Sequence, residues 1–136
     1  MEDQKLHILL IDDDRFQVAA LKKIIDGTAL AGTVSIFEDG KQAIDHITQL
    51  TLLGEGLPHV IFLDINMPVM NAWKFLEAYT RLKRKLYRPI AVYVVTSSTE
   101  GVDMAQSRHF ETVKGYVVKP VTKEKIYQIL KGVVVE

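Results

Sequence analysis

Five short apolar runs, separated by amphipathic stretches, constrain the fold of this chain more than any other feature. Several of the runs are apolar on both faces and rich in Val, Ile, Tyr and Phe. This pattern is typical of parallel strands that helices cover on both sides. The predicted strands are "KLHILLI" (5–11), "TVSIFE" (33–38), "HVIFLD" (59–64), "IAVYVVT" (90–96) and "KGYVVKP" (114–120).

Helical patterns fill the intervals between these strands. The first predicted helix covers 14–26, begins at an Asp14 cap and carries an i, i+3, i+4 stripe of Phe16, Ala19, Ala20, Lys23 and Ile24. Three more helices are predicted after the capping residues Asp39, Asn71 and Thr122, and a shorter one near 99–110. Five alternations of strand and helix predict an open α/β sheet with right-handed crossovers.

Composition sets the broad class. The length of 136 residues suits one domain, 1–136, with a core at about 5–131. There are 17 basic and 17 acidic residues and no cysteine, which excludes a strong field toward nucleic acid, a disulfide framework and a thiolate metal site. No apolar run approaches the length of a membrane span, so we expect a cytoplasmic protein with no nucleic-acid or membrane partner.

Polar residues stand where the predicted strands end, and ligands of such sheets bind at that edge. Asp12, Asp13 and Asp14 follow the first strand, Asp64 ends the third, Thr96 the fourth and Lys119 the fifth. If the strand order is 2-1-3-4-5, the first and third strands are neighbours and their acids crowd together. Two carboxylates ~4 Å apart repel by about 4 kcal/mol at an effective dielectric near 20. Such a cluster takes up protons or binds a hard cation such as Mg²⁺.

Four segments, "LLIDDD", "FLDINMPVM", "VVTSS" and "GYVVKPV", together resemble the response-regulator receiver domain, of the single-domain, chemotaxis-regulator kind. The resemblance covers about residues 5–131. It implies a flavodoxin-like, doubly wound, five-stranded parallel sheet of order 2-1-3-4-5 with five helices. It also implies a phosphoacceptor in a two-component or phosphorelay system, which is not an enzyme beyond its own phosphoryl transfer and dephosphorylation.

The same resemblance implies the roles of the site residues. Asp64 would accept a phosphoryl group from a histidine kinase or a histidine phosphotransfer protein. Asp12, Asp13, Asp64 and the Asn66 carbonyl would bind Mg²⁺.

Other positions would bind or respond to the phosphoryl group. Thr96 and Lys119 would bind its oxygens, and Thr96 and Tyr116 would form the switch. Asn66 and Ser98 stand where the family tunes phosphoryl lifetime. The Lys119–Pro120 bond would be cis.

The sequence departs from the family pattern in three places. Asn71-Ala72 replaces a common Asp-Gly, Val121 stands where Phe is frequent, and "HFETVKGY" replaces a Gly/Ala-rich approach to the last strand. The last two departures predict an unusual output face, whereas Asn71-Ala72 is expected to preserve the fold. No further segment of the chain encodes an output, so we expect an unknown partner protein or onward relay to provide it.

Two alternatives remain at this point. "IDDDRF" contains Asp-x-Asp, which resembles a small haloacid-dehalogenase-like phosphatase with Asp12 as nucleophile. The second is a phosphorylation-independent interaction module. The basic run 81–88 is interpreted as a helix C-terminus, and the four histidines as structural or surface residues. The tail Val133–Glu136 is interpreted as either a packed end or a self-association surface.

Overall fold

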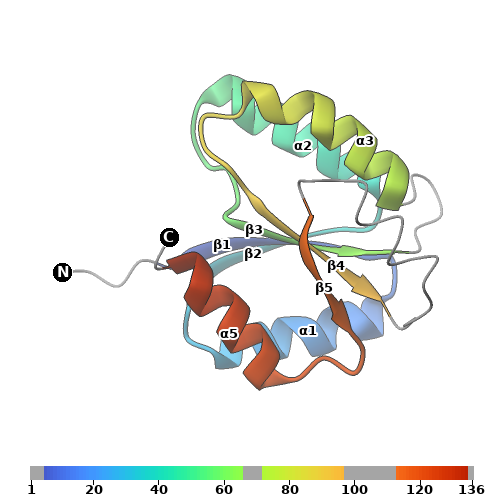
Figure 1. The fold of residues 1–136 in the computed structure, drawn as a ribbon, viewed down its shortest axis with the longest axis vertical. Coiled ribbons are helices and arrows are strands. Elements are labelled where there is room, and N and C mark those ends of the chain that lie inside the picture. Colours follow the sequence, from blue (N-terminus) through green and yellow to red (C-terminus); the bar gives the residue numbers. More distant parts are fainter. Residues whose placement is uncertain (1–4, 66–71, 97–112, 135–136) are drawn as a thin grey trace.

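The computed structural model describes residues 5–65, 72–96 and 113–134. Its centre is a parallel sheet of five strands in the order β2-β1-β3-β4-β5 (Figure 1). The strands are β1 (Leu6–Ile11), β2 (Ala31–Phe37), β3 (Val60–Asp64), β4 (Ala91–Thr96) and β5 (Val113–Val118). The predicted flavodoxin-like fold and strand order are confirmed, with strand ends shifted by up to two residues.

Helices cover both faces of the sheet. They are α1 (Arg15–Gly27), α2 (Gly40–Leu53), α3 (Ala72–Leu82), a short 3-10 helix η1 (Lys83–Lys85) and α5 (Lys123–Val134). Figure 1 shows α1 and α5 on one face and α2 and α3 on the other. The helix expected near 99–110 and the Asn71 cap lie outside the described residues.

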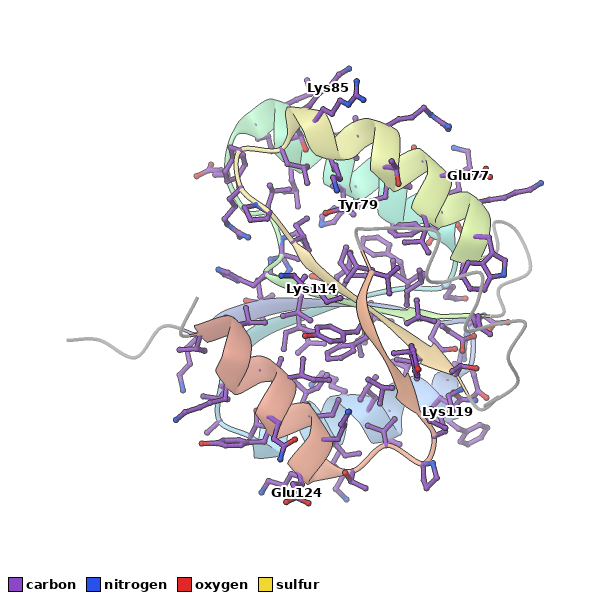
Figure 2. All side chains as sticks on the ribbon, viewed as in Figure 1. Glu77, Tyr79, Lys85, Lys114, Lys119 and Glu124 are labelled. Carbon is purple, nitrogen blue, oxygen red and sulfur yellow. The ribbon has the colours of Figure 1, made fainter. Side chains whose placement is uncertain are left out.

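The strands explain why the core has two halves. β3 is buried at every position and β1 at all but one, as expected for central strands covered on both sides. Alternate side chains therefore enter two apolar clusters, one beneath α2 and α3 and one beneath α1 and α5. In Figure 2, Tyr79 points from α3 toward the sheet, where it is 2% exposed, while Lys85 lies on the outer surface.

The predicted helix caps within the described residues are confirmed. Asp14 accepts hydrogen bonds from the backbone N–H groups of Phe16 and Gln17, and Asp39 accepts one from Gln42. Thr122 accepts one from the backbone N–H of Lys125 at 3.2 Å. Each side chain satisfies an N–H group that the first turn of a helix leaves without a partner.

The predicted apolar face of α1 was wrong for all of its residues except Ile24. Phe16 is 88% exposed, and Ala19, Ala20 and Lys23 are exposed as well. The helix instead turns inward a stripe formed by Val18, Leu21, Ile24 and Ile25. Both stripes have helical spacing, but the second carries larger aliphatic side chains and so removes more apolar surface from water.

The structure agrees in part with the predictions for the basic run 81–88 at the end of α3 and for the tail that follows α5. α3 ends at Leu82 with Arg81 in its last turn, and the 3-10 helix carries the next three cations. Val133 and Val134 pack against the apolar cluster beneath α1 and α5, which favours a packed end over a self-association surface for this part of the tail, while residues 135–136 lie outside the described residues. Within the three described ranges, no helix combines the length and apolarity that crossing a lipid bilayer requires.

Candidate functional site

The acidic part of the site begins where β1 ends. The Asp12 N–H donates to the Phe37 carbonyl at 3.0 Å, so the pairing with β2 extends past the strand. The Asp12 Oδ1 accepts a hydrogen bond from the backbone N–H of Asp14 at 2.9 Å. Asp12 is half-buried and Asp13 is exposed. The tight turn thus directs two adjacent carboxylates toward the same edge of the sheet.

Asp64 ends the neighbouring strand. Ile11 pairs with Leu63 in the sheet, so the next residue of each strand, Asp12 and Asp64, lies at the same level. Asp64 is only 8% exposed. One oxygen from each of Asp12, Asp13 and Asp64 lies within 4.8 Å of the others. The predicted crowding of acids at this edge is present.

The surroundings of Asp12 disfavour its ionised form and raise its pKa. Burial raises the pKa of Asp12 from 3.8 to about 6, the hydrogen bond from Asp14 lowers it, and the nearby charge of Asp64 raises it further. A carboxylate this hard to ionise gains from any cation that enters the cluster.

The same three oxygens suit a hard cation. An octahedral Mg²⁺ site spaces neighbouring ligand oxygens by about 3 Å, and small rotations of these carboxylates can close the observed gaps. The donor set contains oxygen alone, which favours Mg²⁺ over softer metals.

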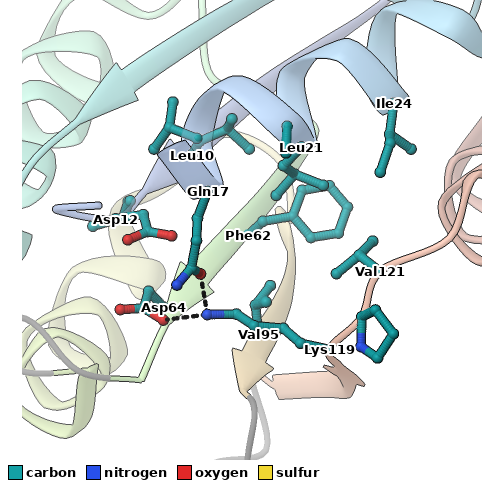
Figure 3. Close-up of a pocket in the computed structure, with 14 residues that line it drawn as sticks. Leu10, Asp12, Gln17, Leu21, Ile24, Phe62, Asp64, Val95, Lys119 and Val121 are labelled. Carbon is teal, nitrogen blue, oxygen red and sulfur yellow. Dashed lines mark hydrogen bonds and ion pairs between the residues drawn. The ribbon is translucent and has the colours of Figure 1, made fainter. Parts of the chain in front are cut away.

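Lys119 directly follows β5, the edge strand, and its side chain extends to the acidic cluster. Its backbone N–H donates to the Thr96 carbonyl at 2.8 Å, and its Nζ lies 3.5 Å from Asp64 Oδ1. The Lys119–Pro120 bond is cis, as the family resemblance implied. Figure 3 shows the ammonium between Asp64 and Gln17. The prediction that Asp64 faces Lys119 agrees with this geometry.

The remaining predicted residues divide into two groups. Thr96 ends β4 at 3% exposure, one residue beyond Val95, the partner of Asp64 in the sheet. Tyr116 is half-buried on β5, where it packs against the cluster beneath α2 and α3. Asn66 and Ser98 lie outside the described residues.

Sequence reasoning missed one residue of the site. Gln17 accepts a hydrogen bond from the Lys119 ammonium and donates one to Asp14 Oδ2 at 3.1 Å. The pattern Asp14-x-x-Gln17 is that of a capping box, which places Gln17 at the start of a helix. Nothing in that local pattern indicates a partner 102 residues away.

A cavity of about 270 Å³ opens beside Gln17 and Lys119 (Figure 3). Its polar border includes Asp12 and Asp64. Its walls are otherwise mainly apolar and come from β1, α1, β3, β4 and the segment before α5: Leu10, Ile11, Val18, Ala20, Leu21, Ile24, Phe62, Val95, Pro120 and Val121.

Comparisons with known proteins agree with this architecture. A profile described as "Response regulator receiver domain" matches residues 8–131. A protein-glutamate methylesterase/protein-glutamine glutaminase of Ralstonia nicotianae is 33% identical over 120 residues, which cover 88% of this chain and 29% of that protein. The corresponding protein of Thermotoga maritima is 33% identical over 74% of this chain and 26% of its own length. The chain therefore spans less than a third of these curated relatives.

Among solved structures, a two component response regulator from Cytophaga hutchinsonii superposes with a TM-score of 0.83 at 28% identity. The match covers 98% of this chain and 100% of that one.

Proposed function

Because this chain belongs to the response regulator receiver domain family of two-component signalling, we propose that Asp64 is its phosphoacceptor. The observation that carries the proposal is the grouping of Asp12, Asp13 and Asp64 within 4.8 Å, with the Lys119 ammonium 3.5 Å from Asp64. Under this proposal, the nucleophile, the cation site and the phosphate-binding ammonium share one edge of the sheet. The family match weighs against the phosphatase alternative, in which Asp12 would be the nucleophile.

In the proposed reaction, an Asp64 oxygen attacks the phosphorus of a phosphohistidine on a histidine kinase or phosphotransfer protein. The P–O bond forms as the P–N bond breaks, and the histidine nitrogen leaves with the electron pair. Lys119 binds the phosphoryl oxygens, and the buried Thr96 hydroxyl donates to them. Asp12 and Asp13, together with Asp64 and the Asn66 carbonyl, would hold Mg²⁺, and the bound ion would supply positive charge to offset that of the transferred group.

The output follows from the added charge. We propose that the Thr96 hydroxyl moves toward phosphorylated Asp64 and that Tyr116 rotates inward behind it. This changes the surface beside β5 that a partner protein recognises. Asn66 and Ser98 tune the lifetime of the phosphoryl group. Structures with and without beryllofluoride test this step, and unchanged side-chain conformations of Thr96 and Tyr116 would rule it out.

Labelling with acetyl phosphate and Mg²⁺ tests the phosphoacceptor itself, read by a phosphate-affinity gel and by mass spectrometry of the modified peptide. Asp64→Asn is expected to abolish labelling. Asp39→Asn, which changes the cap of α2 to another good capping residue, is the matched control and is expected to label normally. Labelling of Asp12 in Asp64→Asn would instead support the phosphatase alternative.

A further inference from the structure

Gln17 is the one residue that joins the start of α1 to the Lys119 ammonium within the described part of the chain. Its Nε2 donates to Asp14 Oδ2 at 3.1 Å, and its Oε1 accepts from Lys119 Nζ. Asp14 is fixed in turn, because its backbone N–H donates to Asp12 Oδ1 at 2.9 Å. A series of hydrogen bonds therefore runs from Asp12 through Asp14 and Gln17 to Lys119.

An ordinary capping role does not explain this arrangement. In a capping box, the third helical residue returns its side chain to the backbone N–H of the cap. Here Asp12 already accepts from the Asp14 N–H, and the Gln17 carbonyl oxygen is directed to Lys119. α2 begins with the same pair, Asp39 and Gln42, and there the Gln42 side chain is exposed. Capping alone therefore does not require the inward contact.

Within the described residues, the Lys119 ammonium makes one direct hydrogen bond and one longer ion pair. Its Nζ is 3.5 Å from Asp64 Oδ1, longer than the 2.7–2.9 Å of a charge-assisted hydrogen bond. Its side chain also borders the 270 Å³ cavity (Figure 3). Among the described residues, the direct hydrogen bond of the ammonium is the one to Gln17.

We propose that Gln17 is a positioning residue for phosphoryl transfer, which rests on the proposed role of Asp64. The Gln17 amide oxygen holds the Lys119 ammonium and keeps it short of a direct hydrogen bond with Asp64. The attacking oxygen of Asp64 thus stays accessible, and the ammonium stays ready for the incoming phosphoryl oxygens. Without Gln17, Lys119 closes onto Asp64, and this tighter pair has to open before transfer.

Gln17→Met tests the proposal because methionine has a similar length but no comparable hydrogen-bond acceptor. Labelling of Asp64 by acetyl phosphate is expected to slow by roughly tenfold, the scale of one hydrogen bond to a charged group. The Lys119 side-chain NMR signals, assigned through Lys119→Arg, are expected to shift in metal-free protein. Gln42→Met is the matched control, since it changes the same helix position after an Asp cap, and should leave both readouts unchanged.

A paired exchange separates positioning from a structural effect. Gln17→Glu combined with Asp14→Asn reverses donor and acceptor between the two side chains and keeps their total charge. The new amide can donate to the new carboxylate, whose second oxygen can accept from Lys119. This double variant is expected to recover most of the lost rate, with thermal unfolding midpoints confirming that each variant is folded.

The outcomes distinguish the two proposals. Wild-type labelling combined with an unchanged rate or unchanged Lys119 signals in Gln17→Met overturns the role of Gln17 alone. A reduced rate that the double variant does not recover also overturns it. Failure of the wild-type protein to label at Asp64 overturns the phosphoacceptor proposal, and the positioning role for transfer falls with it.

Discussion

Polar groups are arranged differently at the two ends of the parallel strands, called here the carboxyl edge and the amino edge of the sheet. At the carboxyl edge, Asp12, Asp13 and Asp64 crowd together, and burial and mutual repulsion raise the pKa of Asp12 to about 6. At the amino edge, polar groups are paired across the strands: the His7 N–H donates to His59 Nδ1 at 2.9 Å. One edge holds charge in a costly arrangement that a ligand can relieve, and the other edge is closed by its own hydrogen bonds.

The segment after η1 completes the amino edge. Arg88 donates to the Pro58 carbonyl at 2.9 Å and also to the Leu57 carbonyl, while the Tyr87 hydroxyl accepts from the Leu57 N–H at 2.9 Å. These bonds fix the chain just before β3. From this difference we expect the amino edge to contribute to stability and the carboxyl edge to binding, and substitutions at each edge can separate the two.

The largest expected difference between the edges is in metal binding. Asp13→Ala removes an exposed carboxylate from the cluster and is expected to weaken Mg²⁺ binding by at least about tenfold, since the cation loses a charged ligand. Arg88→Met, at the opposite edge, is expected to leave Mg²⁺ affinity unchanged. Calorimetric titration measures both. Equal affinity in Asp13→Ala and wild type would remove Asp13 from the ligand set.

Stability is expected to respond in the reverse order. Arg88→Met leaves the carbonyls of Leu57 and Pro58 without their charged donor and should lower the free energy of unfolding by about 2 kcal/mol. Urea unfolding at neutral pH measures the loss. Arg84→Met, which changes an exposed arginine of η1, is the control and should cost less than about 0.5 kcal/mol. Equal losses in the two variants would contradict the stabilising role of the amino edge.

The edges are also expected to titrate with opposite sign. The raised pKa of Asp12 means that the folded state binds its proton first, so this group adds stability as pH falls from above 6 toward 3.8. Burial lowers the pKa of His7 and His59, so the folded state resists their protonation and stability is lost as pH falls below 6.5. Since Asp12 is only half-buried, solvent screening limits its share to about 1 kcal/mol.

Urea unfolding of metal-free protein between pH 5 and 8 separates these contributions. Asp12→Asn should be more stable than wild type at pH 8, with the advantage shrinking as pH falls. His59→Asn keeps an acceptor near the His7 N–H and should flatten the acid loss. Parallel curves for wild type and both variants would show that neither edge titrates as described.

The smallest expected effect concerns the Tyr87 hydroxyl. Tyr87→Phe removes the acceptor of the Leu57 N–H and should lower the free energy of unfolding by about 0.5–1 kcal/mol. Tyr127→Phe changes another exposed tyrosine, on α5, and serves as the control. A difference of less than 0.2 kcal/mol between the variants, on the order of measurement error, would mean that water replaces the hydroxyl at no cost.

The two edges also differ in how far the sequence predicted them. The residues of the carboxyl edge were predictable because each acid or lysine ends an apolar run, and parallel strands bring such ends together. Asn66, Ser98 and the helix near 99–110 stay predictions. The pairing of His7 with His59 had no signal, because neither position shows a spacing that indicates its partner 52 residues away.

The errors have a similar physical origin. The sequence pattern places Phe16 on the buried face of α1 because two apolar stripes share helical spacing, and only the packing against β1 and α5 decides between them. The sequence indicates the helix position of Gln17, which depends on neighbouring residues, but not its contact with Lys119, which depends on the fold. Hydrophobic periodicity and strand order can be predicted from one sequence. Which of two equally periodic helix faces is buried depends on the elements that pack against the helix.

Because the site residues come from different parallel strands, they lie far apart in the sequence and are synthesised at different times. During synthesis, Asp12 and Asp13 emerge first, Asp64 follows, and Lys119 comes 55 residues later (119 − 64 = 55). At roughly 5–20 residues per second, the ribosome needs about 3–11 s for that interval. Until then the nascent chain contains Asp12, Asp13 and Asp64 but lacks the Lys119 ammonium. The complete site can therefore form only after β5 has joined the sheet.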